Sequence, residues 1–375
     1  MKKSAERNTH LKPEDNSHRS VVTIGYLQTD FEIVEKKMSE YRELHGFLAS
    51  VTTVADMRHY WDNEGVERMQ VIKKDDFPKV NGERLRNGIS EEESRMLYEF
   101  TCTQSRYRRF GQTSMEQLFD TGAFDGKNFR ILTVANVMED IFQATFRRNR
   151  FKCRVHKERL GDLDMIVLGA AKAWRKENEA TVNRVQMSLK PFVFKLFSKY
   201  MTSKDHESFV EGINNDEFYV TYTKLSLGNN NVLIRNSIDG IYKNPENSSS
   251  GRVQLCMTPA DCITMQKIPS HVYCAFFANV PYLLISDFDS ANFLDSSESG
   301  KSMKMEPALC DVKRMTKLEA DFTKALTFVR MFIEKVVEIF AENPNCTEIY
   351  CSKTSDCVPV PIKFEIFLDE CADMR

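Results

Sequence analysis

A single acid stands among neutral polar residues between Val232 and Thr258, where the pattern predicts two adjacent strands. The sequence VLIRNSIDGIYKN predicts the first strand, PENSSSG a polar connection, and VQLCMTP the second strand. This arrangement brings Asp239 close to Gln254, and only Asp239 is acidic. A hard divalent cation needs several oxygen ligands, mostly carboxylates with water and substrate phosphate. The two strands therefore have the frame of a metal site but too few carboxylates to fill it.

Arginines mixed with aromatic residues form two basic clusters, SRYRRF at 105–110 and FRRNRFKCR at 146–154. Such clusters can follow a phosphate backbone and stack on bases, so we predict RNA contact for the second cluster and the residues just after it. The candidate RNA-binding residues are Arg147, Arg148, Arg150 and Arg159. Solvated loops and strand ends also produce such clusters, and this alternative stays open.

Cysteine and histidine offer no recognisable chemistry. Cys346, Cys351 and Cys357 are widely spaced and no histidine follows them, so we interpret them as structural residues and not as zinc ligands. The seven histidines are dispersed, without an i, i+4 pair or the context of a nucleophilic triad.

The composition is that of an ordinary globular protein. The chain has 375 residues, of which 42% are hydrophobic, and this is enough to build a large core. With a net charge of −2, binding to nucleic acid would need a local basic patch. Ten cysteines without a C-x-x-C pair, and no N-terminal hydrophobic segment, predict a reducing compartment, either nucleus or cytoplasm. The most apolar run, AFFANVPYLLI, is too short to span a membrane.

Strands and helices alternate along the chain without an internal repeat, and this mixture predicts a single α/β domain. Apolar periodicity predicts strands in SVVTIGYL, FYVTYTKLSL, VLIRNSIDGIY and PYLLISDF. The turn GNNN should join the second and third of these strands as a hairpin. Helices are predicted over 31–44, 192–201 and 311–342, the last of them closed by Pro344. We expect residues 62–93 to form a long surface excursion.

The order of these segments resembles that of the DXO family of RNA 5′-end decapping nucleases and pyrophosphohydrolases. The matching elements are FSKYM for F-x-x-Y-M, NNDEF for N-x-E-F, NSID for G-E-x-D, QLC for E-L-K, and NVPYLLISDF for G-V-P-x-h-h-x-G-F. The match extends from about Ser20 to Cys351. The resemblance implies one large domain of mixed β-sheets that form a central cleft flanked by helices. We place this domain at 20–355, after a disordered tail at 1–19 and before a C-terminal extension at 356–375.

The resemblance also implies which positions belong to the active site. In the family the helix provides a glutamate, G-E-x-D two acids, and E-L-K a glutamate, a backbone carbonyl and a lysine. The corresponding positions in this chain are Ser198, Ser237, Asp239, Gln254, the Leu255 carbonyl and Cys256. We expect Asp239 and the Leu255 carbonyl to be the remaining metal ligands, and the other positions to line a neutral pocket. The tryptophan-arginine-glycine element of the family would fall near 134–136, where neither an aromatic residue nor an arginine stands. The chain thus resembles a divergent member with degenerate active-site motifs.

Charge counting predicts impaired catalysis. Three glutamates and an aspartate can neutralise two Mg²⁺ ions, whereas Asp239 alone leaves about three positive charges uncompensated. One Mg²⁺ or Mn²⁺ held together with substrate phosphates is an open alternative, and without activity no cofactor is expected. Asp239 also has a purely structural interpretation, because an aspartate before Gly240 commonly caps a turn.

A second segment imitates the acidic motifs. GDLD at 161–164, with SLK at 188–190, would retain Asp162 and Asp164 as an acid pair. The helix, the NDEF element and the hairpin that should precede the site all follow this segment. We therefore interpret both acids as exposed residues at the start of a strand.

Three functions remain open from the sequence. The leading hypothesis is a decapping-nuclease-like protein with impaired or lost metal-dependent catalysis, acting in RNA 5′-end surveillance through RNA or protein binding. One alternative is an active hydrolase or exonuclease for NAD-type, triphosphate or incompletely capped RNA 5′ ends. Another is a protein-interaction scaffold. The expected partners are RNA 5′ ends and a protein of RNA decay, with no membrane and no evident preference for DNA.

Overall fold

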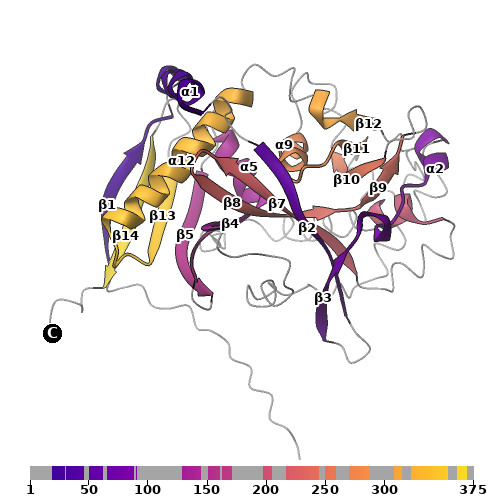
Figure 1. The fold of residues 1–375 in the computed structure, drawn as a ribbon, viewed down its shortest axis with the longest axis horizontal. Helices are drawn as coiled ribbons and strands as arrows, with labels where there is room; N and C mark the ends of the chain where they lie inside the picture. The colour runs from indigo at the N-terminus through magenta and orange to yellow at the C-terminus, as the bar shows by residue number, and fades with distance from the viewer. Residues whose placement is uncertain are drawn as a thin grey trace, which may run out of the picture.

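The structure is a computed structural model in which two β-sheets carry the helices packed against them (Figure 1). It describes residues 19–29, 31–45, 50–61, 66–87, 90, 129–144, 151–160, 163–170, 197–204, 217–244, 250–258, 270–287, 308–314, 322–353 and 361–369. None of the helices in these ranges is long and apolar enough to cross a membrane.

The larger sheet has ten strands. They are β1 (Arg19–Leu27), β2 (Ser50–Trp61), β3 (Glu67–Ile72), β4 (Ile131–Val134), β5 (Phe151–Leu160), β6 (Leu163–Ala170), β7 (Phe218–Leu227), β8 (Asn230–Ile238), β13 (Glu348–Lys353) and β14 (Ile362–Asp369). Their order in the sheet is β1-β14-β13-β5-β6-β4-β8-β7-β2-β3. The predicted hairpin is confirmed, because β7 and β8 are antiparallel and meet at Gly228, whose φ of 60° suits glycine.

The smaller sheet has four strands and adjoins the larger one (Figure 1). They are β9 (Gly240–Lys243), β10 (Ser250–Thr258), β11 (Tyr282–Asp287) and β12 (Ala308–Asp311), in the order β12-β11-β10-β9. β10 and β11 are parallel, and helix α9 (Ser270–Phe277) lies between them in the sequence. Asp239 separates β8 from β9, so the chain passes from one sheet to the other at this residue.

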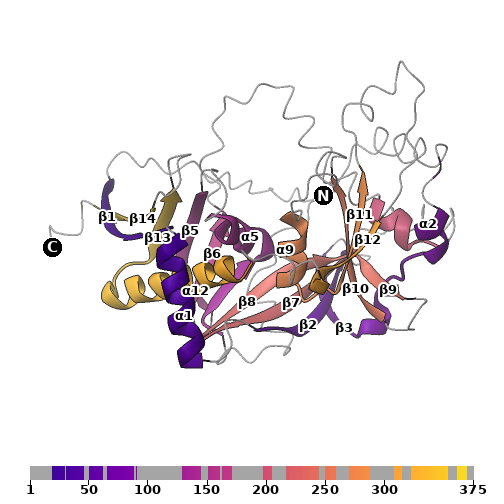
Figure 2. The same ribbon diagram turned by 90° about the horizontal axis from the view of Figure 1, so that it is seen from above.

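Helices pack along the larger sheet and bury its core. α1 (Phe31–His45), α12 (Phe322–Glu342), α5 (Ala135–Gln143) and α9 follow one another across the sheet in Figure 2. Alternate residues of β8 show the two faces. Val232 and Ile234 belong to the helix-covered core, whereas Leu233 packs in a separate cluster on the opposite face.

Two predicted boundaries need correction. The long helix was predicted from residue 311, but Asp311 ends β12 and pairs with Tyr282; residues 312–314 are helical, and α12 runs over Phe322–Glu342. The segment predicted as a C-terminal extension supplies β14, which lies between β1 and β13 and buries Phe364 in the core. A boundary at 355 therefore cuts through the larger sheet.

Local structure also occurs where a surface excursion was predicted. This part of the chain contains β3, a short 3-10 helix η1 (Lys74–Asp76) and α2 (Gly82–Asn87). The predicted tail lies outside the described residues, apart from Arg19, which begins β1. The described part of the predicted helix 192–201 is residues 197–201, which are helical, and the helix continues to 202.

Candidate functional site

Asp239 connects three elements at the junction of the two sheets. Its carboxylate accepts a hydrogen bond from Ser198 Oγ at 2.7 Å and another from the Leu255 N–H at 2.7 Å. Ser198 lies on the helical segment and Leu255 on β10. The Asp239 N–H donates to Val253 O at 3.2 Å. Each carboxylate oxygen thus has a protein donor, as a structural role for this aspartate requires.

The surroundings of Asp239 disfavour its charged form. The residue is half-buried, and burial raises the pKa of its carboxyl group. The hydrogen bonds from the Leu255 N–H and Ser198 Oγ act in the opposite direction but do not cancel the effect of burial. The protein therefore favours the protonated carboxyl more than water does.

A close backbone approach holds the residue that follows Asp239. A Cβ at Gly240 would lie 2.6 Å from Pro78 O and 3.2 Å from Thr202 Cγ2. The Ile241 N–H donates to Pro78 O at 2.8 Å, and the Val80 N–H donates to Ile241 O at 2.9 Å. The chain around Pro78 thus extends the edge of the smaller sheet, and the space at 240 admits only glycine without a shift.

Gln254, at a position where the resemblance implies a glutamate, acts as a hydrogen-bond donor. The residue is 8% exposed. Its Nε2 donates to Asn236 Oδ1 at 3.1 Å and to Ser237 O at 2.7 Å, and Asn236 Nδ2 donates to Cys274 O of α9 at 2.7 Å. A glutamate at 254 would direct a carboxylate oxygen at two oxygen acceptors. The local structure is therefore built for glutamine.

The other predicted pocket positions are neutral as well. The side chain of Ser237 is exposed on β8. Cys256 lies in β10, but its side chain is outside the described part of the structure. Val134 ends β4 with 38% of its surface exposed, and Asn136 lies in the first turn of α5. The place of the tryptophan-arginine-glycine element thus offers neither an aromatic ring nor a cation.

Ion pairs neutralise charged residues around this junction. Arg252 of β10 pairs with the buried Asp56 of β2, with 3.0 Å between Nε and Oδ1, and links the two sheets. Arg58 pairs with Glu217, whose carboxylate also lies 4.0 Å from Lys199 Nζ. These acids are therefore engaged by cations of the protein itself.

The described residues do not assemble a metal site. No group of three or more histidine, cysteine or acidic side chains in the described ranges could hold a metal ion. Both oxygens of Asp239 face donors, and Leu255, which was predicted to offer a carbonyl to a metal, offers its N–H to Asp239. Gln254 directs N–H groups at its neighbours. This donor set does not fit the two cations that the resemblance implies.

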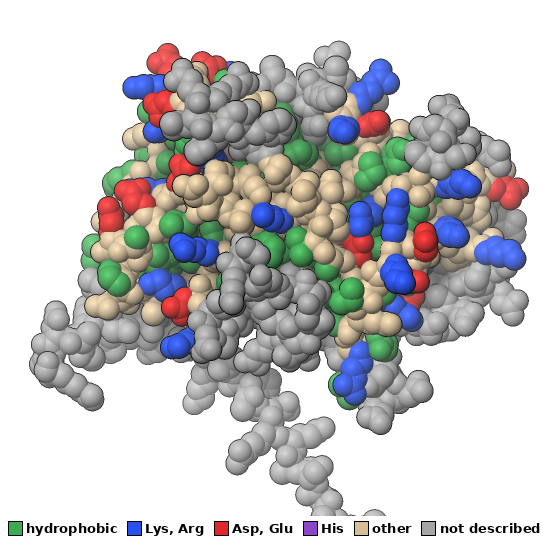
Figure 3. All heavy atoms as spheres, in the orientation of Figure 1, with side chains coloured by type: hydrophobic (Ala, Val, Ile, Leu, Met, Phe, Trp, Pro, Cys, Tyr) green, Lys and Arg blue, Asp and Glu red, His purple; other side chains and the backbone are tan. Residues whose placement is uncertain are grey.

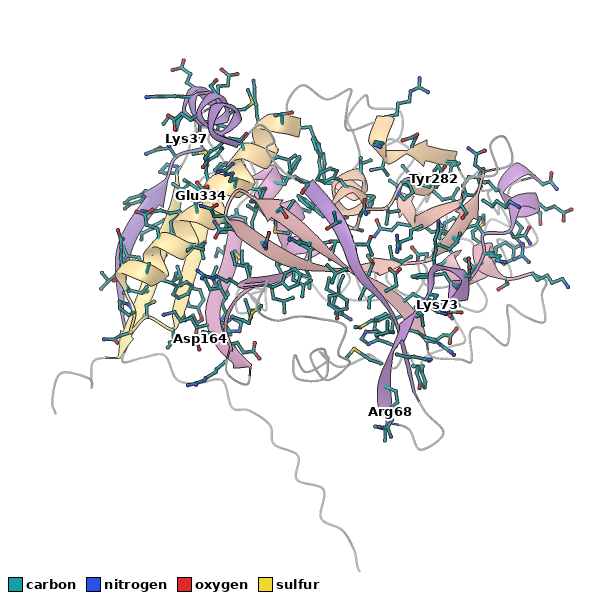
Figure 4. The ribbon with its side chains drawn as sticks, viewed as in Figure 1. Lys37, Arg68, Lys73, Asp164, Tyr282 and Glu334 are labelled. Atoms are coloured by element: carbon teal, nitrogen blue, oxygen red, sulfur yellow. The ribbon has the colours of Figure 1, made fainter. Side chains whose placement is uncertain are left out.

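The predicted RNA-binding arginines are not brought to this site by the described structure. Three of them lie outside the described residues: Arg147, Arg148 and Arg150. Arg159 is exposed near the end of β5, opposite Asp164 of β6. β4 runs parallel to both β6 and β8, so Asp164 at the start of β6, labelled in Figure 4, and its partner Arg159 lie at the other end of the strands from Asp239, which follows the end of β8. Asp164 is an exposed residue at a strand start, as predicted, and Asp162 is outside the described residues.

Sequence reasoning missed a basic surface beside the site. Figure 3 shows Lys and Arg side chains over the region of β3 and η1, with acidic side chains among them. The exposed basic residues there are Arg68, Lys73, Lys74 and Lys79. Lys74 Nζ donates to the carbonyl of Ser250, so this surface leads to the start of β10. No sequence signal marks it, because Asp75 and Asp76 stand among the basic residues.

Solved structures share this fold, although no protein-family model and no curated protein matches the sequence. Rai1 of Candida albicans in complex with pU5 and Mn²⁺ has a TM-score of 0.58, with 10% identity over 85% of this chain and 89% of that chain. Dxo1 of K. lactis in complex with manganese has a TM-score of 0.50, with 8% identity over 84% of this chain and 89% of that chain.

A mutant Rai1 structure is also similar to this chain. It is Rai1 of S. pombe with three glutamates replaced by one serine and two glutamines, in complex with 3′-FADP. Its TM-score is 0.50, with 12% identity over 86% of this chain and all of that chain. These similarities confirm the predicted fold class: the chain has the mixed α/β fold of the Rai1 and Dxo1 structures.

Proposed function

We propose that this chain is a decapping-nuclease-like protein that binds RNA 5′ ends without metal-dependent hydrolysis. We further propose that it acts in RNA 5′-end surveillance or regulation, in the nucleus or the cytoplasm. The observation that carries the proposal is the use of hydrogen bonds where metal ligands would be needed. Asp239 is held by Ser198 and Leu255, and Gln254 donates to Asn236 and Ser237 O. Phosphoryl chemistry with two cations requires oxygen ligands at such positions.

The mutant Rai1 structure supports nucleotide binding by this fold when three glutamates are replaced. In that structure three glutamates are replaced by one serine and two glutamines, and the protein holds 3′-FADP. The resemblance assigns three glutamates to the positions of Ser198, Ser237 and Gln254, which are two serines and one glutamine in this chain. Serine and glutamine in place of glutamates are therefore compatible with a bound nucleotide in this fold.

RNA is the ligand that the comparison and the surface favour together. Rai1 of Candida albicans is in complex with pU5. In this chain the exposed basic surface of β3 and η1 leads to β10 through Lys74. Exposed lysines and arginines of this kind contact the phosphates of an RNA chain.

Fluorescence anisotropy with a 3′-labelled oligoribonucleotide tests the proposal, with gel analysis of the same samples for cleavage. We expect binding in EDTA as tight as in Mn²⁺, and intact RNA in both. Lys73→Glu with Lys74→Glu should weaken binding several-fold, because two phosphate contacts become repulsive. Lys36→Glu, at an exposed residue of α1, is the matched control and should leave the affinity unchanged.

Two outcomes would contradict the proposal and identify an alternative. Mn²⁺-dependent release of nucleotides or a cap, abolished by Asp239→Ala, would establish an active decapping hydrolase. A folded protein that does not bind RNA would leave the protein-interaction scaffold as the remaining hypothesis.

A further inference from the structure

Two buried cysteines face each other where β5 meets β13 in the larger sheet. Cys153 and Cys351 are directly opposite residues in this antiparallel pair of strands. Both belong to the helix-covered core and each is 1% exposed, so their side chains point to the same face. Opposite residues on one face of such a pair have Cβ atoms about 4.5–5.5 Å apart. The two sulfur atoms are therefore neighbours, although the residues lie far apart in the sequence.

The backbone of this pair suits a disulfide bond. Opposite Cα atoms in antiparallel strands are about 4.5 or 5.5 Å apart, depending on the hydrogen-bond pattern. Both values lie within the range of about 4.4–6.8 Å that disulfides span, and the Cβ atoms need to approach by only about 1 Å. The Cys153 thiol donates a hydrogen bond to the carbonyl of Arg154 at 3.7 Å. This contact is weak, so the bond between the sulfurs would replace little.

The other cysteines whose contacts the structure describes have no such partner. Cys274 lies on α9, Cys310 of β12 is opposite a leucine of β11, and Cys346 precedes β13. All three are free thiols, as are Cys153 and Cys351. Within this set, strand register brings two sulfurs together only at Cys153 and Cys351.

The position of the pair in the sheet gives a bond there a mechanical consequence. β13 connects β14 and β1 to β5 and the rest of the sheet, in the order β1-β14-β13-β5 (Figure 1). A bond between β5 and β13 would prevent these three strands from separating from the other seven. It would also close a long loop, from residue 153 to residue 351, and so restrict the unfolded chain.

Burial protects both thiols while β5 and β13 stay paired. It raises the pKa of Cys153 to about 12, and it raises the pKa of Cys351, to which the neighbouring Cys153 contributes. Because the thiolate is the attacking form in disulfide exchange, the closed sheet should react slowly. Local opening of β13 from β5 would expose the sulfurs, and reclosure after oxidation would bury the new bond away from reductants.

We propose that Cys153 and Cys351 are a redox-sensitive pair, which a disulfide oxidant such as oxidised glutathione converts into a cross-strand disulfide between β5 and β13. One thiolate attacks a sulfur of the oxidant and releases the first glutathione. The other thiolate then attacks the mixed disulfide and releases the second glutathione. Two thiols are oxidised to one disulfide, and the two released glutathiones take up the two protons. The pair acts on the stability of the fold and does not depend on RNA binding.

The full chain, reduced and then incubated with oxidised glutathione, tests the proposal. Urea below the unfolding transition is included, because it promotes the opening of β13. After alkylation of free thiols, digestion with trypsin and Glu-C separates Cys351 from the cysteines on either side of it, by cleavage after Glu348 and Lys353. Mass spectrometry should show its peptide linked to that of Cys153. Without urea, the thermal midpoint of the oxidised protein should be about 3–10 °C above that of the reduced protein.

Cys153→Ala should abolish both the linked peptide and the rise in the midpoint. Cys346→Ala, at a half-buried cysteine before β13, is the matched control and should keep both. The mass spectrum of the wild-type protein decides the matter even where Cys153→Ala fails to fold. Recovery of Cys153 and Cys351 as alkylated thiols or glutathione adducts would overturn the inference, and so would a linked pair without a rise in the midpoint.

Discussion

The carboxylate of Asp239 has a donor on each oxygen, and substitutions can separate its charge from its role as an acceptor. Asp239→Asn keeps an oxygen for the Leu255 N–H and offers an N–H to Ser198 Oγ, so we expect a folded protein at least as stable as wild type at neutral pH. Asp239→Ala leaves both donors without an acceptor and should cost about 2–4 kcal/mol. Urea denaturation followed by circular dichroism measures both. An asparagine variant less stable than the alanine variant would contradict this role.

The same carboxyl group predicts a pH dependence of stability. Burial raises its pKa above the ordinary value of 3.8, so the folded state binds this proton at a higher pH than the unfolded state. The contribution of Asp239 to stability is therefore lost as the pH rises through the folded pKa, and is fully present below the unfolded pKa. Relative to Asp239→Asn, wild type should gain stability as the pH falls toward about 4. Denaturation of both proteins at several pH values measures this difference, and a gain on raising the pH would refute it.

Among the elements, the contact between β9 and the chain at Pro78 depends on Gly240. In Gly240→Ala the new Cβ would meet Pro78 O, which already accepts from the Ile241 N–H, so this carbonyl cannot move freely. We expect a loss of about 1–3 kcal/mol in thermal or urea denaturation. Gly82→Ala at the start of α2 is the matched control, since nothing lies within 4 Å of its Cβ. Equal stability of the two variants would show that the backbone at Pro78 can move away from a Cβ at position 240.

For the molecule as a whole, the C-terminal strand is part of the fold. Deletion of 356–375 removes β14 from between β1 and β13 and takes Phe364 out of the core. We expect the truncated chain to lose its cooperative thermal transition, because both flanking strands lose a partner and the core a large side chain. Deletion of 370–375 alone, which spares β14, should keep the transition. A cooperative transition in the longer deletion would show that β14 is dispensable.

Sequence patterns predicted the secondary structure well where the local pattern of apolar and turn residues matches the place of the segment in the fold. The β7–β8 hairpin and the apolar stripe of α12 follow from periodicity and turn residues alone. The pairing of β14 with β1 joins the two ends of the chain, and no local pattern reports such a contact. The same holds for the candidate site. Residue types predicted a neutral pocket, but the direction of the Gln254 amide depends on Asn236 meeting Cys274, 38 residues away.

Whether hydrogen bonds have taken the place of metal ligands at Asp239 can be measured by titrating Mn²⁺ into the protein and following the free ion by electron paramagnetic resonance. Wild type and Asp239→Asn are compared under identical conditions. We expect the two proteins to bind Mn²⁺ equally and only weakly, because no set of carboxylates anchors the ion at this junction. One or two tightly bound Mn²⁺ ions in wild type that Asp239→Asn removes would show instead that a metal site persists.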